Sequence, residues 1–179
     1  MIAPTPNRIG FGDAGAQFNV YIANRPPMTE YASLQTVQPL DGGEIQAINQ
    51  ACGNGWRKVF NVYAKLLFAL DKTQFGFSQQ ATSWQQYRDT LLLQAKSQTA
   101  LLFSSPELNT ALGTVHIITG RTYAKTLLDA GLPARFIWLN HEFAVDKYNR
   151  LLVCPYFDYR QLNNEKLVFL ARMIKALDE

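Results

Sequence analysis

Residues 115–133, VHIITGRTYAKTLLDAGLP, join a short β-branched run to a helix through one tight turn. The run at 115–118 predicts a strand, because β-branched side chains favour extended backbone. Thr119-Gly120-Arg121 predicts the turn, and we expect the helix that follows to end at Gly131, with Pro133 just beyond. A strand that leads through a tight turn into a helix is the repeating unit of α/β folds.

The rest of the chain continues this alternation. Residues 1–16 are expected to be an irregular lead-in, and residues 28–43 a long loop or partly helical crossover. Apolar runs predict strands at 18–23, 100–103 and 136–139, with a hairpin of 143–145 and 151–153, and helical patterns predict helices at 43–52, 55–71, 84–96 and 164–177, with a helical turn at 106–112. We therefore predict an α/β fold with three layers, α/β/α, and a mostly parallel sheet of four to five strands.

The predicted helix at 55–71 carries the clearest core pattern. Its large apolar residues follow one another at spacings of four, three, four and three, and they are Trp56, Phe60, Tyr63, Leu67 and Leu70. These spacings place the side chains on one helical face. We expect that face to pack against the sheet.

The composition indicates one globular domain over residues 1–179. Hydrophobic residues make up 47% of the chain and charged residues 17%, which excludes an intrinsically disordered protein. The formal net charge of +3 is compatible with a phosphate-bearing partner. We expect a cytoplasmic protein with no membrane partner, because we find neither a signal-peptide pattern nor about 18 consecutive apolar residues.

Several function classes lack their usual sequence support. The chain has no GxGxxG, GxxxxGKS/T, GxSxG or HExxH motif, and Cys52 and Cys154 are far apart. Dinucleotide binding, phosphate-loop chemistry, serine hydrolysis and zinc proteolysis are therefore not indicated. We predict no cofactor, no metal ion and no disulfide framework.

The predicted topology indicates where a site should lie. Ligands of open parallel sheets bind outside the carboxyl ends of the strands. The segments that follow those ends are 24–28, 104–106, 119–122, 140–142 and 155–162. We expect any functional side chains to come from these segments.

Two of these segments combine polar and cationic residues. Asn24 and Arg25 follow the first predicted strand, where they could orient a water or hold a phosphate, or merely end the strand in a turn. Gly120 and Arg121 lie where a helix N-terminus attracts anions, although a plain capped turn would read the same way. His141 follows another strand and has Glu142 beside it, so it is a candidate general base or part of a polar loop.

The loop at residues 155–160 is the densest chemical feature. Tyr156, Phe157 and Tyr159 surround one carboxylate and are followed by Arg160. Aromatic rings interleaved with a cation are typical of base stacking or minor-groove insertion. The alternative is an aromatic-rich loop that covers the end of the sheet.

Three stretches resemble motifs of the uracil-DNA glycosylase superfamily, whose fold is a short parallel sheet between helices. Residues 23–27, ANRPP, are similar to the Gly-Met-Asn-Pro-Gly stretch that follows the family's first strand. Residues 117–121, IITGR, resemble its strand followed by Gly-Lys or Gly-Arg at a helix start. Residues 151–158, LLVCPYFD, stand in the place of its last strand and His-Pro-Ser-Pro loop.

The resemblance implies roles for particular residues. Asn24 would position the attacking water, and Tyr156 would stand where the family's histidine stabilises the departing base. Residues 157–162 would enter the minor groove of DNA next to a flipped base. The implied partner is DNA or a nucleobase, and the implied reaction is hydrolysis of an N-glycosidic bond.

Two functions remain open at this point. The first is a glycosylase-like protein that binds nucleic acid or a nucleobase, and the second is a non-catalytic protein-interaction module that uses the aromatic loop. A basic strip that joins Arg25, Arg121 and Arg160 would favour the first function. An exposed apolar patch without that strip would favour the second.

Overall fold

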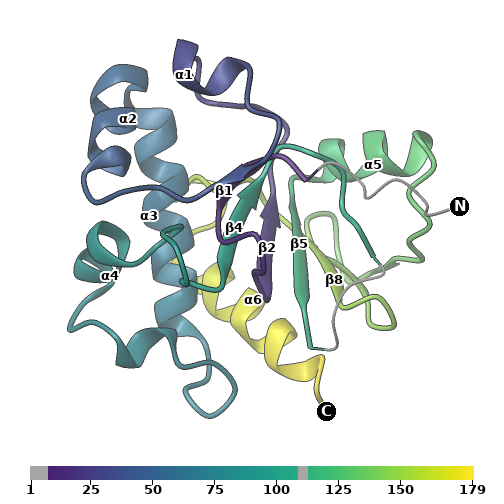
Figure 1. Cartoon of the computed structure of the whole chain (residues 1–179). Helices are drawn as coiled ribbons and strands as arrows, with labels where there is room; N and C mark the ends of the chain where they lie inside the picture. Colours follow the sequence, from purple (N-terminus) through teal and green to yellow (C-terminus); the bar gives the residue numbers. More distant parts are fainter. Residues whose placement is uncertain (1–7, 109–112) are drawn as a thin grey trace, which may run out of the picture.

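A computed structural model of the chain describes residues 8–108 and 113–179 (Figure 1). The strands in these residues are β1 (Gly10–Gly12), β2 (Phe18–Tyr21), β3 (Val37–Gln38), β4 (Thr99–Leu102), β5 (Val115–Thr119), β6 (Ile137–Trp138), β7 (Ala144–Asp146) and β8 (Leu151–Cys154). They form one eight-stranded sheet with the order β3-β1-β4-β2-β5-β8-β7-β6.

The sheet is mixed, which corrects the predicted mostly parallel sheet of four to five strands. Its centre is parallel, since β2 pairs in parallel with β4 and β5, and β5 pairs in parallel with β8. Antiparallel strands extend it on both sides, with β1 beside β4 on one side and β7 and β6 beyond β8 on the other. The α/β class and the hairpin of β7 and β8 are confirmed.

Strand β1 lies in the segment that the sequence predicted to be irregular. Its sequence, GFG, looks like a loop because glycine is depleted in strands. Gly12 has a φ of +119°, and a β-carbon there would lie 2.2 Å from the carbonyl oxygen of Thr99. Glycine therefore allows the close approach of β1 to β4 that creates this part of the sheet.

Helices cover both faces of the sheet (Figure 1). They are α1 (Thr29–Ala32), α2 (Glu44–Cys52), α3 (Asn54–Ala69), a 3-10 turn η1 (Phe77–Gln79), α4 (Trp84–Thr90), α5 (Arg121–Asp129) and α6 (Asn164–Ala176). The larger apolar cluster contains α3 and α6, and the smaller one contains α5. The side chains of β2 point alternately to the two faces of the sheet and so reach both clusters. Phe18 and Val20 belong to the larger cluster and Tyr21 to the smaller.

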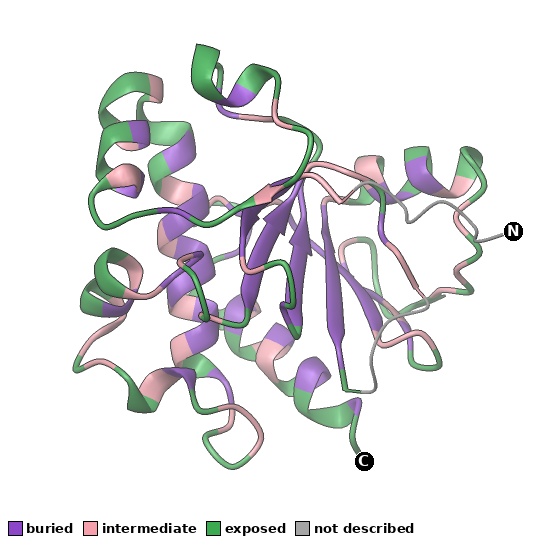
Figure 2. Ribbon diagram, in the orientation of Figure 1, coloured by how far each residue is buried: buried purple, intermediate pink, exposed green. Residues whose placement is uncertain are grey.

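The core pattern predicted for α3 is confirmed. Trp56, Phe60, Tyr63 and Leu67 are buried in the larger cluster, and Figure 2 shows α3 buried on the side that faces the sheet. The hydroxyl of Tyr63 donates a hydrogen bond to the carbonyl oxygen of Ala100 on β4 at 2.8 Å. This bond satisfies a polar group that would otherwise be buried without a partner.

Two predicted helices differ from the structure. Helix α4 ends at Thr90 instead of residue 96, and Leu93 and Lys96 have positive φ angles of 61° and 64°, which interrupt a right-handed helix. Residues 106–108 are not helical, and the remaining residues of that predicted turn, 109–112, lie outside the described residues. None of the described helices has the length and apolar character that a membrane crossing requires.

Candidate functional site

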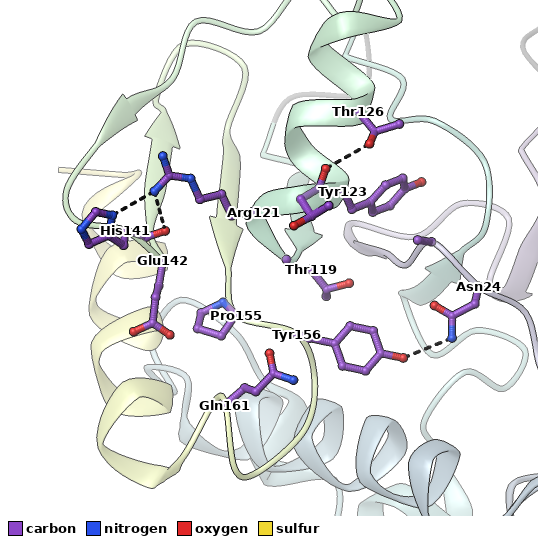
Figure 3. A pocket seen from close by; sticks show the side chains of 13 residues that line it. Asn24, Thr119, Arg121, Tyr123, Thr126, His141, Glu142, Pro155, Tyr156 and Gln161 are labelled. Atoms are coloured by element: carbon purple, nitrogen blue, oxygen red, sulfur yellow. Dashed lines mark hydrogen bonds between the residues drawn. The ribbon is translucent and has the colours of Figure 1, made fainter.

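A pocket of about 670 Å³ opens at the carboxyl ends of β2, β5 and β8 (Figure 3). This volume falls in the usual range for small-molecule sites. The pocket is lined by Ala23, Asn24, Thr119, Gly120, Arg121, Thr122, Tyr123, Thr126, His141, Glu142, Pro155, Tyr156 and Gln161. Five of the nine residues predicted for the site therefore line one pocket, and they are Asn24, Gly120, Arg121, His141 and Tyr156.

Asn24 and Tyr156 point toward each other across the pocket (Figure 3). The Nδ2 of Asn24 donates to the hydroxyl oxygen of Tyr156 at 3.4 Å, a long and weak contact. Burial raises the pKa of the Tyr156 phenol, and the hydrogen bond from Asn24 acts in the opposite direction. The phenol is therefore protonated at neutral pH, and its own proton is available to a ligand.

The turn between β5 and α5 is hydrogen-bonded to the ends of the two neighbouring strands, β2 and β8. The hydroxyl of Thr119 donates to the carbonyl oxygen of Tyr21 on β2 at 2.9 Å. The N–H of Gly120 donates to the carbonyl oxygen of Cys154 on β8 at 2.7 Å, with a φ of +97° that favours glycine. The first N–H groups of α5, which begins at Arg121, therefore open beside the pocket without intrahelical acceptors.

Arg121 contacts His141 instead of pointing into the pocket. Its Nη1 lies 3.1 Å from the Nδ1 of His141 and donates to the His141 carbonyl oxygen at 3.2 Å. A guanidinium can only donate, so Nδ1 is the acceptor and the ring proton of His141 is on Nε2. In Figure 3 the His141 ring lies beyond Arg121, away from Tyr156. His141 therefore lies at the rim of the pocket, and its role as a general base stays a prediction.

A carboxylate that was not among the predicted site residues also lines the pocket. Glu142 accepts two hydrogen bonds from the Nζ of Lys166 on α6, at 2.7 and 2.9 Å. The oxygen Oδ1 of Asn140 accepts from the N–H groups of Glu142 and Phe143 and so shapes the turn before β7. Lys166 is distant in sequence, so no local pattern indicates this ion pair.

Four predicted site residues lie outside the pocket lining. The Nη1 of Arg25 donates to carbonyl oxygens of Tyr31, Ala32 and Leu34 at 3.2 Å each, so its donors serve the end of α1. Its guanidinium also lies 5.8 Å from the centroid of the Phe103 ring. Arg25 is therefore a structural residue in this fold.

The aromatic loop divides between core and surface. Phe157 is fully buried, with its ring centroid 5.7 Å from that of Tyr63, so the predicted insertion of Phe157 into DNA is not compatible with its position. Tyr159 is exposed, and the Nζ of Lys58 lies 5.0 Å from the centroid of its ring. The Nη2 of Arg160 forms an ion pair with the Oδ2 of Asp158 at 3.5 Å. Arg25, Arg121 and Arg160 are each engaged within the chain and do not form a free basic strip.

His116, the second histidine, is a buried residue of strand β5. Its Nδ1 lies 2.7 Å from the hydroxyl of Tyr21, and both side chains are buried. Burial lowers the pKa of His116 to about 4, and the charges of Arg8 and Arg150 act in the same direction. Within residues 8–108 and 113–179, no three His, Cys, Asp or Glu side chains are grouped so that they could hold a metal ion.

Residues 9–175 match the model of DUF6942, a family of unknown function. The chain belongs to the DUF6942 family. No curated protein and no solved structure matches the chain. The family match carries no link to the uracil-DNA glycosylases, so that resemblance stays a prediction.

Proposed function

We propose that the pocket binds a nucleobase and that the chain hydrolyses the N-glycosidic bond of that base in a nucleic acid. The observation that carries the proposal is that Asn24 and Tyr156, from the ends of two different strands, meet across one pocket. These are the two residues to which the resemblance assigns the water and the departing base. Their sequence separation makes the meeting a property of the fold and not of a local motif.

The polar atoms of the pair have complementary roles. Because Asn24 donates through Nδ2, its Oδ1 is the atom left to accept a hydrogen bond, and no described residue donates to that oxygen. The Tyr156 O–H is left to donate. In the proposed reaction Oδ1 holds the attacking water, and Tyr156 donates to a carbonyl oxygen of the base.

The reaction breaks the bond between the sugar carbon and the base nitrogen. The electron pair of that bond stays on the base, which leaves as an anion, and the water oxygen bonds to the sugar carbon. The proton that the water loses ends on the base anion, so the products are the free base and a sugar hydroxyl. A donor at the place where negative charge develops stabilises such a transition state. The protonated Tyr156 and the open N–H groups at the start of α5 are donors at the pocket.

The alternative, a protein-interaction module that uses residues 155–160, has less support. Phe157 in that loop is buried, and the exposed large apolar side chains of the described residues include a run of three at Ile137, Trp138 and Leu139. The run of exposed apolar residues therefore lies at 137–139, whereas the aromatic loop exposes Tyr159 and buries Phe157.

The test uses labelled single-stranded oligonucleotides that contain one uracil or one hypoxanthine. Fluorescence anisotropy measures binding at low and moderate salt, and chromatography measures the released base. Tyr156→Phe removes one hydroxyl and should weaken binding by about 3- to 10-fold, the worth of one hydrogen bond. Tyr159→Phe, which removes a hydroxyl outside the pocket, is the matched control and should bind like the wild type.

The outcomes separate binding from catalysis. Binding with base release supports the whole proposal. Binding that Tyr156→Phe weakens, without base release, keeps the nucleobase site and removes the hydrolysis. If the folded protein does not bind at low salt, the proposal is wrong.

A further inference from the structure

A second cleft lies in the helical layer, between α2, α3 and α4. Helix α3 packs against both of the other helices, and Figure 1 shows the three on the same side of the sheet. The cleft has a volume of about 480 Å³, which is enough for a small molecule. It shares no lining residue with the pocket at the strand ends, so it is a separate feature of the molecule.

The lining of this cleft consists of polar side chains. Helix α2 contributes the carboxamides of Gln46, Asn49 and Gln50, whose spacings of three and one place them on one helical face. Helix α3 contributes Arg57 and Asn61, one turn apart, and α4 contributes two charged residues. Such a lining favours a ligand that makes hydrogen bonds over one that buries apolar surface.

The two charged residues of α4 hold part of the lining in place. Arg88 donates through Nε and Nη2 to the two carboxylate oxygens of Asp89, at 2.8 and 3.1 Å. Its Nη1 donates to the Oδ1 of Asn61 at 2.7 Å, so the Nδ2 of Asn61 is left to donate. Asp89 is 55% exposed, and its oxygens retain lone pairs beyond the two that Arg88 uses. The cleft therefore presents an oriented amide donor and an anionic acceptor.

Arg57 carries the charge of the cleft that has no partner. Within residues 8–108 and 113–179, its guanidinium forms no ion pair and no hydrogen bond. Arg88 and Asp89 neutralise each other, so two cations and one anion leave a net charge of +1. The planar fork of a guanidinium matches a carboxylate. A phosphate dianion would need a second free cation and would be repelled by Asp89.

The carboxamides of α2 also have hydrogen-bonding capacity to spare. The side chains of Gln46 and Gln50 make no hydrogen bond with the described residues. The Oδ1 of Asn49 is buried and receives no hydrogen bond from them either. A buried acceptor without a partner requires an explanation, and a donor that enters the cleft would supply one.

We propose that this cleft binds a free α-amino acid as its zwitterion. The inference does not depend on the proposed function. The carboxylate of the ligand accepts from the guanidinium of Arg57 and from the Nδ2 of Asn61, and its ammonium group donates to Asp89. The carboxamides of α2 are left for the side chain of the ligand. A polar amino acid such as glutamine therefore fits better than an apolar one.

The first test separates the zwitterion from its two halves. NMR of the isotope-labelled protein follows the Arg57 Nε–H and the Asn61 side-chain amide during titration with L-glutamine, acetate or methylammonium. L-Glutamine should shift both signals at concentrations about 10-fold or more below those of acetate or methylammonium, because one molecule makes both charged contacts. If acetate acts at the same concentrations as L-glutamine, or if L-glutamine causes no shift up to its solubility limit, the proposal is wrong.

The second test assigns the two ends of the ligand. Arg57→Gln should weaken L-glutamine binding by about 10-fold, as the loss of a charged hydrogen bond does. Asp89→Asn should also weaken L-glutamine but leave acetate binding at least as strong, because it removes only the partner of the ammonium group. Arg172→Gln removes an exposed arginine of α6 outside the cleft and should bind like the wild type.

Circular dichroism of each variant establishes that it is folded, which is expected because Arg57 and Asp89 are exposed. Wild-type affinity in Arg57→Gln would contradict the carboxylate contact. An equal loss of L-glutamine and acetate binding in Asp89→Asn would contradict the ammonium contact, and the cleft would then be a plain anion site.

Discussion

The α3 face of the sheet and the pocket at its carboxyl ends use tyrosine in opposite ways. Tyr63 on α3 is fully buried, and its hydroxyl donates to a carbonyl oxygen of β4 at 2.8 Å. Tyr156 is half-buried, and its hydroxyl only meets the amide of Asn24 at 3.4 Å. The first hydroxyl has its partner within the fold, whereas the second has a free proton at an open pocket. Stability should therefore depend on the first region and ligand binding on the second.

The largest effect is expected on the α3 face. Phe60→Ala should lower the free energy of unfolding by about 3–5 kcal/mol, because it removes a fully buried ring and leaves a cavity. Urea denaturation followed by circular dichroism measures the change. An unchanged denaturation midpoint would show that this face does not support the fold.

The buried histidine predicts a pH dependence. The pKa of His116 is about 4 in the folded chain against an ordinary value of 6.5, so below pH 6.5 the unfolded chain binds the proton first. Stability should then fall as the pH decreases from 6.5 to about 4, by up to about 3 kcal/mol, and the contribution of His116 should level off below that. NMR titration of the His116 ring, with unfolding measured at each pH, checks this. A ring that titrates near 6.5 would contradict its burial.

A smaller effect separates the two tyrosines. Tyr63→Phe should cost about 1–3 kcal/mol, because it takes one hydrogen bond from the buried carbonyl oxygen of Ala100. Thermal or urea unfolding measures it. A Tyr63→Phe variant as stable as the wild type would contradict the inference that stability depends on the Tyr63 hydrogen bond.

The smallest effect is the stability change at the pocket. Tyr156→Phe should alter the free energy of unfolding by less than about 0.5 kcal/mol, as changes away from the core do. The same urea titration that tests Tyr63→Phe provides the measurement. A loss comparable to that of Tyr63→Phe would mean that Tyr156 is a structural residue, and the pocket would lose its main candidate.

Much of the fold could be predicted because its central elements carry strong periodic signals. The spacing in α3 and the apolar runs of β2, β4, β5 and β8 all correspond to elements of the structure. The apolar run at 136–139 likewise corresponds to β6, whereas the two-residue strand β3 is too short to show a period. Strand β1 was missed because its glycines, which permit the contact with β4, are read in a sequence as loop residues.

The position of a site residue could be predicted from the sequence only where the topology of the sheet determines that position. Asn24, Gly120 and Tyr156 follow parallel strands, so topology alone brings them to one edge. Phe157 could not be placed, because no period determines which way a side chain faces in an irregular loop. Arg25 could not be placed either, because its acceptors belong to α1, a four-residue helix without a sequence signal.

NMR of the isotope-labelled protein during titration with uracil tests the central claim most directly. The account predicts concentration-dependent shifts of the Asn24 side-chain amide and of the N–H groups of Gly120 and Arg121, because all three line the pocket. Tyr156→Phe should reduce these shifts at equal uracil concentration, whereas Tyr159→Phe should not. If the shifts are absent at saturating uracil, or fall on residues away from these strand ends, the pocket is not a nucleobase site.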